Sequence, residues 1–295
     1  MRTILFSSVK IFLCALIALV PLCNISAHTN TGKAPIVQQQ KKQSKKKAKT
    51  KVEPLFGKKL QNVEIKSDKL KGACFYIVSG HGGPDPGAVN RHNGHELHED
   101  EYAYDVALRL ARNLMEEGAE VRIIIQDKND GIRSGTYLKN SKSETCMGAK
   151  IPKKQNARLR QRTDKINSLY KKDKKKYKYV RAIFLHVDSR STGTNIDVHF
   201  YHAKGSRSGE KTAIAIRDMF KQKYKKHNPK RGYNGTVGVH PKGLYVVNNT
   251  YPPAILIELA NIRNSRDLKR IIVEDNRQAM ANWMREALIK DYKAK

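Results

Sequence analysis

The sequence predicts a single α/β domain whose central sheet, mostly parallel or mixed, carries helices on both faces. Short apolar runs alternate with longer segments in which apolar residues recur every three or four positions, as in strands that alternate with helices. The part of the chain with this pattern, residues 71–293, has the length of one domain. Polar residues suited to chemistry follow or end three of the apolar runs, where α/β sheets place their sites.

The first half of this domain begins with an apolar run that reads as a buried strand. A helix follows, because Ala103, Ala107, Leu110 and Leu114 recur at helical spacing and Gly118 is a good stop signal. The expected elements are a strand over 73–79, a helix over 100–117, a strand over 119–125, a polar loop over 126–155 and a basic helix over 157–170.

The second half alternates in the same way and ends in an amphipathic helix. Its expected elements are strands over 180–187 and 195–201, a helix over 208–226, strands over 243–247 and 254–259, and a helix over 275–292. In this arrangement His81, His186 and Glu258 fall at the carboxyl ends of strands. We therefore expect a metal site at that edge of the sheet.

The N-terminus has the pattern of a signal peptide, residues 1–27. A positive start precedes a nearly continuous apolar run over 11–22, which is too short for a stable membrane span, and Ser26 and Ala27 are small enough for cleavage. Lipidation of Cys23 is less favoured, because Leu22 stands where a small residue is usual. The mature protein is predicted to be exported to the periplasm or cell envelope.

Residues 28–70 are polar and of low complexity, and we expect a disordered basic linker. Seven lysines crowd into residues 41–51 with no acid among them. The whole chain carries 58 Lys and Arg against 27 Asp and Glu, a formal net charge of +31. In an exported protein this charge favours an anionic envelope polymer or a membrane surface as partner, and no nucleic acid is expected. A merely solvated charged face stays equally open. We expect a monomer.

Two cysteines, Cys74 and Cys146, remain after removal of the signal peptide. An exported pair can form a disulfide, but Cys74 lies on a predicted buried strand, where a thiol also serves as simple packing. Both interpretations stay open.

The segment from Ser79 to Ala88, SGHGGPDPGA, is the most informative motif. Its glycines let the backbone bend sharply, so that His81 stands exposed on a tight turn after a strand. Catalytic zinc takes three nitrogen or oxygen ligands and keeps one open position. His81 and His186 are natural nitrogen ligands, and Glu99, at the start of a helix, is favoured over Glu96 as the third.

Glu258 is a lone acid within the apolar run Ile-Leu-Ile-Glu-Leu at 255–259. Burial of a carboxylate is costly unless the group is paired or used, and apolar surroundings raise its pKa, which suits a general acid or base.

Other polar residues near these motifs are given structural roles. The stretch His95-Glu-Leu-His98 imitates a zinc-protease motif, but its histidines are three residues apart where four are needed. We expect these two and His92 to be loop residues near the cleft. Asp85 is expected to form the turn or to support a ligand, and Arg158 and Arg162 to make salt bridges.

Four motifs in this order resemble those of the zinc-dependent N-acetylmuramoyl-L-alanine amidases, bacterial cell-wall hydrolases. The matching segments are 80–88, Glu99 with 107–110, 184–188 and 253–260. By position the resemblance implies that His81, Glu99 and His186 hold Zn²⁺ and that Glu258 is the catalytic glutamate. Asp188 and Ala260 depart from the usual asparagine and glycine, and neither is a ligand.

The resemblance implies hydrolysis of the amide between N-acetylmuramic acid and L-alanine in peptidoglycan. The alternative is a catalytically inactive relative that acts as a basic envelope-binding protein, which would have no need of Glu258. A zinc carboxypeptidase is weaker, because no arginine can be assigned to hold a free carboxylate.

Overall fold

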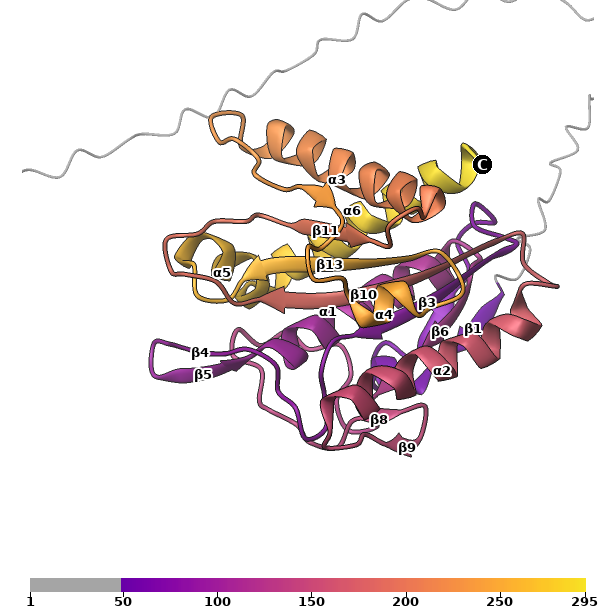
Figure 1. The fold of residues 1–295 in the computed structure, drawn as a ribbon, viewed down its shortest axis with the longest axis horizontal. Helices are drawn as coiled ribbons and strands as arrows, with labels where there is room; N and C mark the ends of the chain where they lie inside the picture. Colours follow the sequence, from indigo (N-terminus) through magenta and orange to yellow (C-terminus); the bar gives the residue numbers. More distant parts are fainter. Residues whose placement is uncertain (1–48) are drawn as a thin grey trace, which may run out of the picture. The chain divides into compact units, whose positions relative to one another are not determined.

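The central sheet has six strands, and the computed structural model, which describes residues 49–295, orders them β12-β11-β13-β10-β3-β6 (Figure 1). The strands are β3 (Ala73–Ser79), β6 (Glu120–Ile123), β10 (Tyr179–Asp188), β11 (His199–His202), β12 (Val237–Gly238) and β13 (Ala254–Asn261). Neighbouring pairs are parallel except β11 with β13. The sheet is therefore mixed and mostly parallel, which confirms the predicted class.

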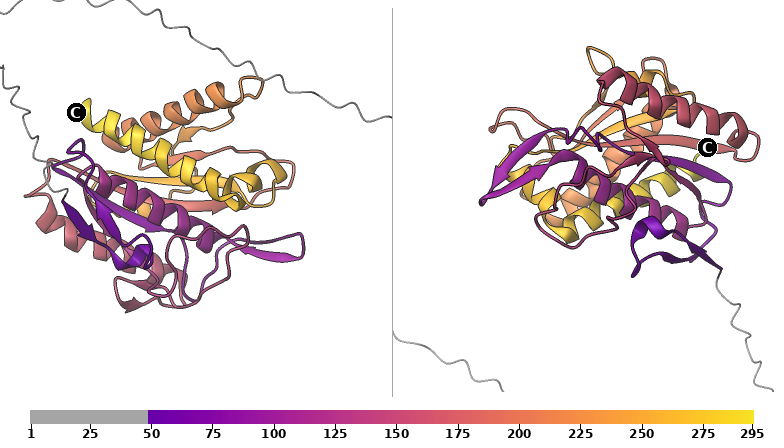
Figure 2. Two further views of the ribbon diagram at one scale, coloured as in Figure 1. Left: turned by 180° about the vertical axis from the view of Figure 1, so that it is seen from behind. Right: turned by 90° about the horizontal axis from the view of Figure 1, so that it is seen from below.

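Helices cover both faces of this sheet. The helices α1 (Glu99–Glu116), α3 (Arg207–His227), α5 (Ser265–Ile272) and α6 (Glu274–Lys293) pack on one face, and Figure 2 shows α1 and α6 lying across it. The helices α2 (Gln155–Asp173) and α4 (Tyr245–Asn248) pack on the other. Because side chains alternate along a strand, Ile183 and Leu185 enter the first core, and Ala182 and Phe184 the second.

Three elements of the second half differ from the prediction, and one of them is the two-residue strand β12, which was not expected. Residues 243–247 were expected to be a strand, but Tyr245 to Asn248 form the short helix α4. The helix α5 was not expected at all. It begins after Asn264, whose side chain accepts hydrogen bonds from the amides of Arg266 and Asp267, so a local cap starts a helix only eight residues long.

The folded domain begins earlier than residue 71. The predicted signal peptide and the linker up to residue 48 lie outside the described residues. From residue 50 on the linker prediction is wrong, because β1 (Thr50–Val52) pairs with β2 (Asn62–Glu64) and the 3₁₀ turn η1 (Pro54–Phe56) lies between them. Phe56, Val63 and Leu70 are buried in the core that α1 shares. Three well-spaced apolar residues suffice to attach this basic segment to the domain.

The polar segment after β6 also contains short strands. A three-stranded antiparallel sheet joins β7 (Ile125–Gln126), β8 (Thr145–Cys146) and β9 (Ala149–Lys150). Upstream, β4 (Val89–His92) and β5 (His95–His98) form a hairpin that projects from the domain in all views (Figures 1 and 2). The three histidines expected in a loop therefore lie on this hairpin.

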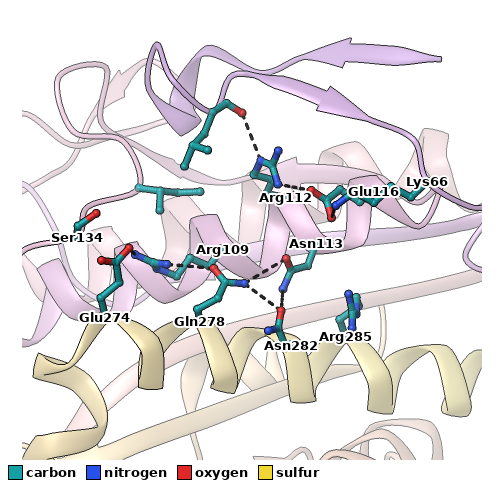
Figure 3. Close-up of a pocket in the computed structure, with 12 residues that line it drawn as sticks. Lys66, Arg109, Arg112, Asn113, Glu116, Ser134, Glu274, Gln278, Asn282 and Arg285 are labelled. Atoms are coloured by element: carbon teal, nitrogen blue, oxygen red, sulfur yellow. Dashed lines mark hydrogen bonds and ion pairs between the residues drawn. The ribbon is translucent and has the colours of Figure 1, made fainter. Parts of the chain in front are cut away.

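The interface between α1 and α6 is polar at its middle (Figure 3). Arg109 donates to Gln278 at 3.0 Å, and the amides of Asn113 and Gln278 both donate to Asn282, at 2.9 and 3.0 Å. These residues line a cavity of about 330 Å³. Because its lining groups mostly pair with one another and lie about three helical turns along α1 from Glu99, this cavity is separate from the predicted metal site.

Cys74 and Cys146 are both buried and both free, so the structure has no disulfide between them. Each thiol lies in the core on the α2 face of the sheet, which fits simple packing. Among residues 49–295 no helix combines the length and the apolar character needed to cross a membrane.

Candidate metal centre

The turn after β3 presents His81 in an unusual backbone conformation. Its φ is 55°, a left-handed region that non-glycine residues rarely adopt and that marks stored strain at functional sites. Two contacts hold it there. Asp85 Oδ2 lies 2.8 Å from His81 Nδ1, and the Arg162 guanidinium donates to the His81 carbonyl. Arg158 in turn contacts Asp85 at 2.5 Å. The imidazole is thereby oriented with Nε2 facing Glu99.

Glu99, the first residue of α1, is placed between the two histidines. Its Oε1 lies 2.9 Å from His186 Nδ1 and 3.3 Å from His81 Nε2. The backbone amide of Val187 donates to the same oxygen at 3.0 Å, and that of Ala88 donates to Oε2 at 2.9 Å. The carboxylate is thus fixed by backbone from two separate segments.

The three side chains have the donor set and the spacing of a zinc site. One ligand atom from each of His81, Glu99 and His186 lies within 4.8 Å of the other two. Tetrahedral zinc with bonds of 2.0–2.1 Å holds its ligands about 3.3 Å apart, close to the contacts of Glu99. Two glycines make room, since a Cβ on Gly80 would lie 2.4 Å from the His186 ring and one on Gly87 2.6 Å from Glu99. These residues fit a zinc ion.

The hydrogen bonds that join Glu99, His81 and Asp85 shift the pKa values of these groups. Burial alone would raise the pKa of Glu99, but its hydrogen bonds to His186 and His81 lower it well below the usual range. Burial lowers the pKa of His81, but the hydrogen bonds to Asp85 and Glu99 outweigh this effect and raise the pKa to about 10. The bond to His81 lowers the pKa of Asp85 to about 2. Glu99 and Asp85 are therefore anionic and suited to a cation.

Glu258 lies beside this group on the neighbouring strand. In the parallel pairing of β10 with β13 it is the register partner of His186, so both side chains project from the same face of the sheet. Its Oε2 is buried and has no hydrogen-bond partner among the described residues. Burial, followed by the charges of Glu99 and Asp188, raises the pKa of Glu258 well above its ordinary value.

Residues with rival or minor roles are also located. Glu96 is half exposed on β5 and pairs with Arg91, so the structure does not bring it to the histidines. Arg158 makes the expected salt bridge, whereas Arg162 contacts a backbone carbonyl instead.

His199, to which the sequence interpretation gave no role, is the antiparallel register partner of Glu258. Only the pairing of β11 with β13 reveals this proximity, so no local signal in the sequence could have found it.

A small cavity opens beside the metal-binding side chains. Its volume is about 40 Å³, and its lining includes His81, His186, Arg158, Arg162 and Val246. The turn after β3 supplies His81, β10 supplies His186, and α2 and α4 supply the other three. The two imidazoles line this cavity, Glu99 contacts both of them, and Glu258 is the register partner of His186. This arrangement suits metal-assisted hydrolysis.

Comparison with solved structures identifies the fold. The CwlD amidase of Clostridioides difficile, solved with the GerS lipoprotein, aligns with a TM-score of 0.55 at 19% identity and covers 76% of this chain and 98% of its own. The catalytic domain of CwlV, an amidase from Bacillus (Paenibacillus) polymyxa var. colistinus, gives 0.52 at 18% identity, covering 77% and 100%. At these identities the likeness establishes the fold alone.

Sequence comparison identifies the family. The germination-specific N-acetylmuramoyl-L-alanine amidase of Bacillus subtilis strain 168 is 28% identical over 201 residues, which cover 66% of this chain and 69% of that protein. A family model described as N-acetylmuramoyl-L-alanine amidase matches residues 75–290, from β3 into α6. The chain therefore belongs to the N-acetylmuramoyl-L-alanine amidase family.

Proposed function

We propose that this chain is a zinc-dependent hydrolase that cleaves the amide between N-acetylmuramic acid and L-alanine in peptidoglycan. One observation carries the proposal. In a chain of this family, a two-histidine, one-carboxylate set converges within ligand distance next to Glu258, whose buried Oε2 has no hydrogen-bond partner among the described residues.

In this proposal one group of residues binds the zinc ion and a separate residue transfers protons. His81 Nε2, His186 Nδ1 and Glu99 Oε1 hold the zinc, which supplies Lewis acidity toward the scissile carbonyl. Asp85 accepts the Nδ1 proton of His81 and so keeps the lone pair on Nε2. Asp85 anchors the His81 ring, and the amides of Val187 and Ala88 anchor Glu99, which keeps these two donors in place without substrate.

Glu258 is the acid/base of the reaction in this proposal. As a base it takes the proton of the attacking water, and as an acid it returns that proton to the nitrogen of L-alanine as the amide breaks. Its raised pKa supports both tasks, since a carboxyl in apolar surroundings holds a proton more readily than an exposed one and can return it to the leaving nitrogen. Glu258 is the register partner of His186 in the pairing of β10 with β13, which supports action at the metal.

The experiment is digestion of purified peptidoglycan by the zinc-loaded protein, with mass analysis of the products. The expected products are stem peptides with a free L-alanine amino group and intact glycan strands. Cleavage within the stem peptide or between sugars would refute the assignment. Binding to peptidoglycan without release of peptides would instead favour the inactive envelope-binding relative. Glu258→Gln is the matched control, because it keeps the shape of the site.

The proposal includes export to the cell envelope, and it rests there on the sequence of residues 1–27. It also includes attachment of the basic segment 28–46 to an anionic surface, to which each lysine contributes about 1 kcal/mol at low salt. A chain that begins at Lys47 keeps the whole described domain. It is expected to match the mature chain on a soluble muramyl peptide and to bind anionic vesicles more weakly. Equal binding at low salt would make the segment only a spacer.

A further inference from the structure

A second cluster of acids lies one residue beyond the zinc ligand Glu99. Asp100 and Glu101 belong to the first turn of α1, and Glu144 directly precedes β8. Only 2%, 1% and 6% of their surfaces are exposed. One carboxylate oxygen from each lies within 4.8 Å of the other two. Three buried acids therefore converge on one small volume.

The protein contacts of this cluster leave it short of positive charge. Arg133 pairs with Glu101 at 2.8 Å, and the backbone amide of Ser141 also donates to Glu101. Glu144 accepts from the amide of Gly83, at 2.8 Å, and has no cationic partner among the described residues. Among the described residues one guanidinium thus faces three carboxylates. Buried charge without a partner is strongly unfavourable, so the cluster needs protons or a further cation.

Asp100 has a buried carboxylate oxygen that is available to bind a cation. Its Oδ1 accepts from the amide of Glu101 at 3.0 Å, whereas its Oδ2 is buried and has no partner among the residues described. This buried oxygen, within a group of three acids whose ligand atoms converge, is therefore available to a cation.

We propose that Asp100, Glu101 and Glu144 bind a hard divalent cation of the calcium class. All the donors are carboxylate oxygens, which calcium prefers, in contrast to the imidazoles of the zinc site. Calcium–oxygen bonds of 2.3–2.6 Å allow two ligands of one ion to lie at most about 5 Å apart, which the observed spread satisfies. The unpartnered oxygen of Asp100 is the first ligand, and the positive end of α1 favours acids there without neutralising them.

The cation links three segments, namely the start of α1, the turn after β3 and the polar segment 126–155. Asp100 follows Glu99 directly, and Glu144 holds the Gly83 amide in the turn that carries His81. Glu101 fixes the polar segment through Ser141 and Arg133. An ion among the three acids therefore ties the polar 126–155 segment to both sides of the zinc site. Its role is structural, and it is separate from the proposed hydrolysis.

The test measures calcium binding to the zinc-loaded protein, so that the imidazole site is already filled. Isothermal titration with CaCl₂ is expected to show one calcium ion per chain, and thermal melting is expected to shift upward with calcium. Asp100→Asn and Glu144→Gln, which keep the side-chain shape, are expected to weaken calcium binding by at least about tenfold, the lower end of what loss of even an outer ligand partner costs. Zinc content is expected to stay at one per chain in both.

Glu96→Gln is the matched control, because it removes a nearby carboxylate that lies outside the cluster. It is expected to bind calcium as the unchanged protein does. The proposal is overturned if the zinc-loaded protein binds no calcium at millimolar concentration, which would mean that the acids share protons instead. It is also overturned if both cluster variants bind calcium with unchanged affinity, since the ion would then lie elsewhere.

Discussion

Glu99 and Asp100 are consecutive residues of the same helical turn, yet their surroundings have opposite effects. Glu99 faces two imidazoles, and its pKa is lowered. Asp100 faces two other acids, and its pKa is raised to about 9. Burial and the helix dipole act on both, so the neighbours across the fold decide the difference. The N-terminus of α1 thereby separates two sites with different preferences for metals.

The first prediction concerns this separation and has the largest expected effect. Glu99→Gln, His81→Ala and His186→Ala are each expected to lose zinc and with it all hydrolysis, because three ligands are the minimum for a catalytic site. Asp100→Asn is expected to keep its zinc. Metal analysis after dialysis measures both. If Asp100→Asn is stripped of zinc while Glu99→Gln stays loaded, the two carboxylates have been assigned the wrong way round. Glu96→Ala serves as a further control and is expected to stay fully loaded.

The second prediction separates proton transfer by Glu258 from metal binding at the proposed zinc site. Glu258→Gln is expected to reduce kcat by about 10²–10⁴-fold, the usual cost of losing a general acid or base, with zinc still bound. Single-turnover release of stem peptide and zinc content are measured on the same sample. A rate within threefold of the unchanged protein would remove Glu258 from the mechanism.

The third prediction has the smallest effect and concerns the support of His81. Asp85→Asn is expected to weaken zinc affinity by about 10–100-fold, because the carboxylate that orients the ligand ring is lost. Competition with a zinc chelator measures this affinity. Calcium binding at the acid cluster is expected to be unaffected. A variant with unchanged zinc affinity would show that Arg162 alone holds the turn.

The centre of the sheet was predictable because β3, β10 and β13 are largely continuous apolar runs and the helices between them have apolar residues at helical spacing. The convergence of His81, Glu99 and His186 was predictable because glycines around His81 and a helix start at Glu99 are local signals. The folded segment at 50–70 was missed, since Phe56, Val63 and Leu70 are scattered among charged residues and gain burial only against α1.

The acid cluster could not have been predicted from local pattern either. Glu144 lies far from Asp100 in sequence, and nothing near it distinguishes it from a surface acid. Only the return of the polar segment to the start of α1 brings the two together.

The register of His186 with Glu258 has a consequence for how such an enzyme can diverge. Their separation is set by the hydrogen-bonded ladder between two central strands, and strand spacing is nearly invariant. Loops at the rim can therefore lengthen, acquire new binding groups or be exchanged without altering the distance between ligand and acid. Variation in substrate preference is then open to loop grafting, while changes that slip one strand against the other by a single residue would destroy the reaction at once.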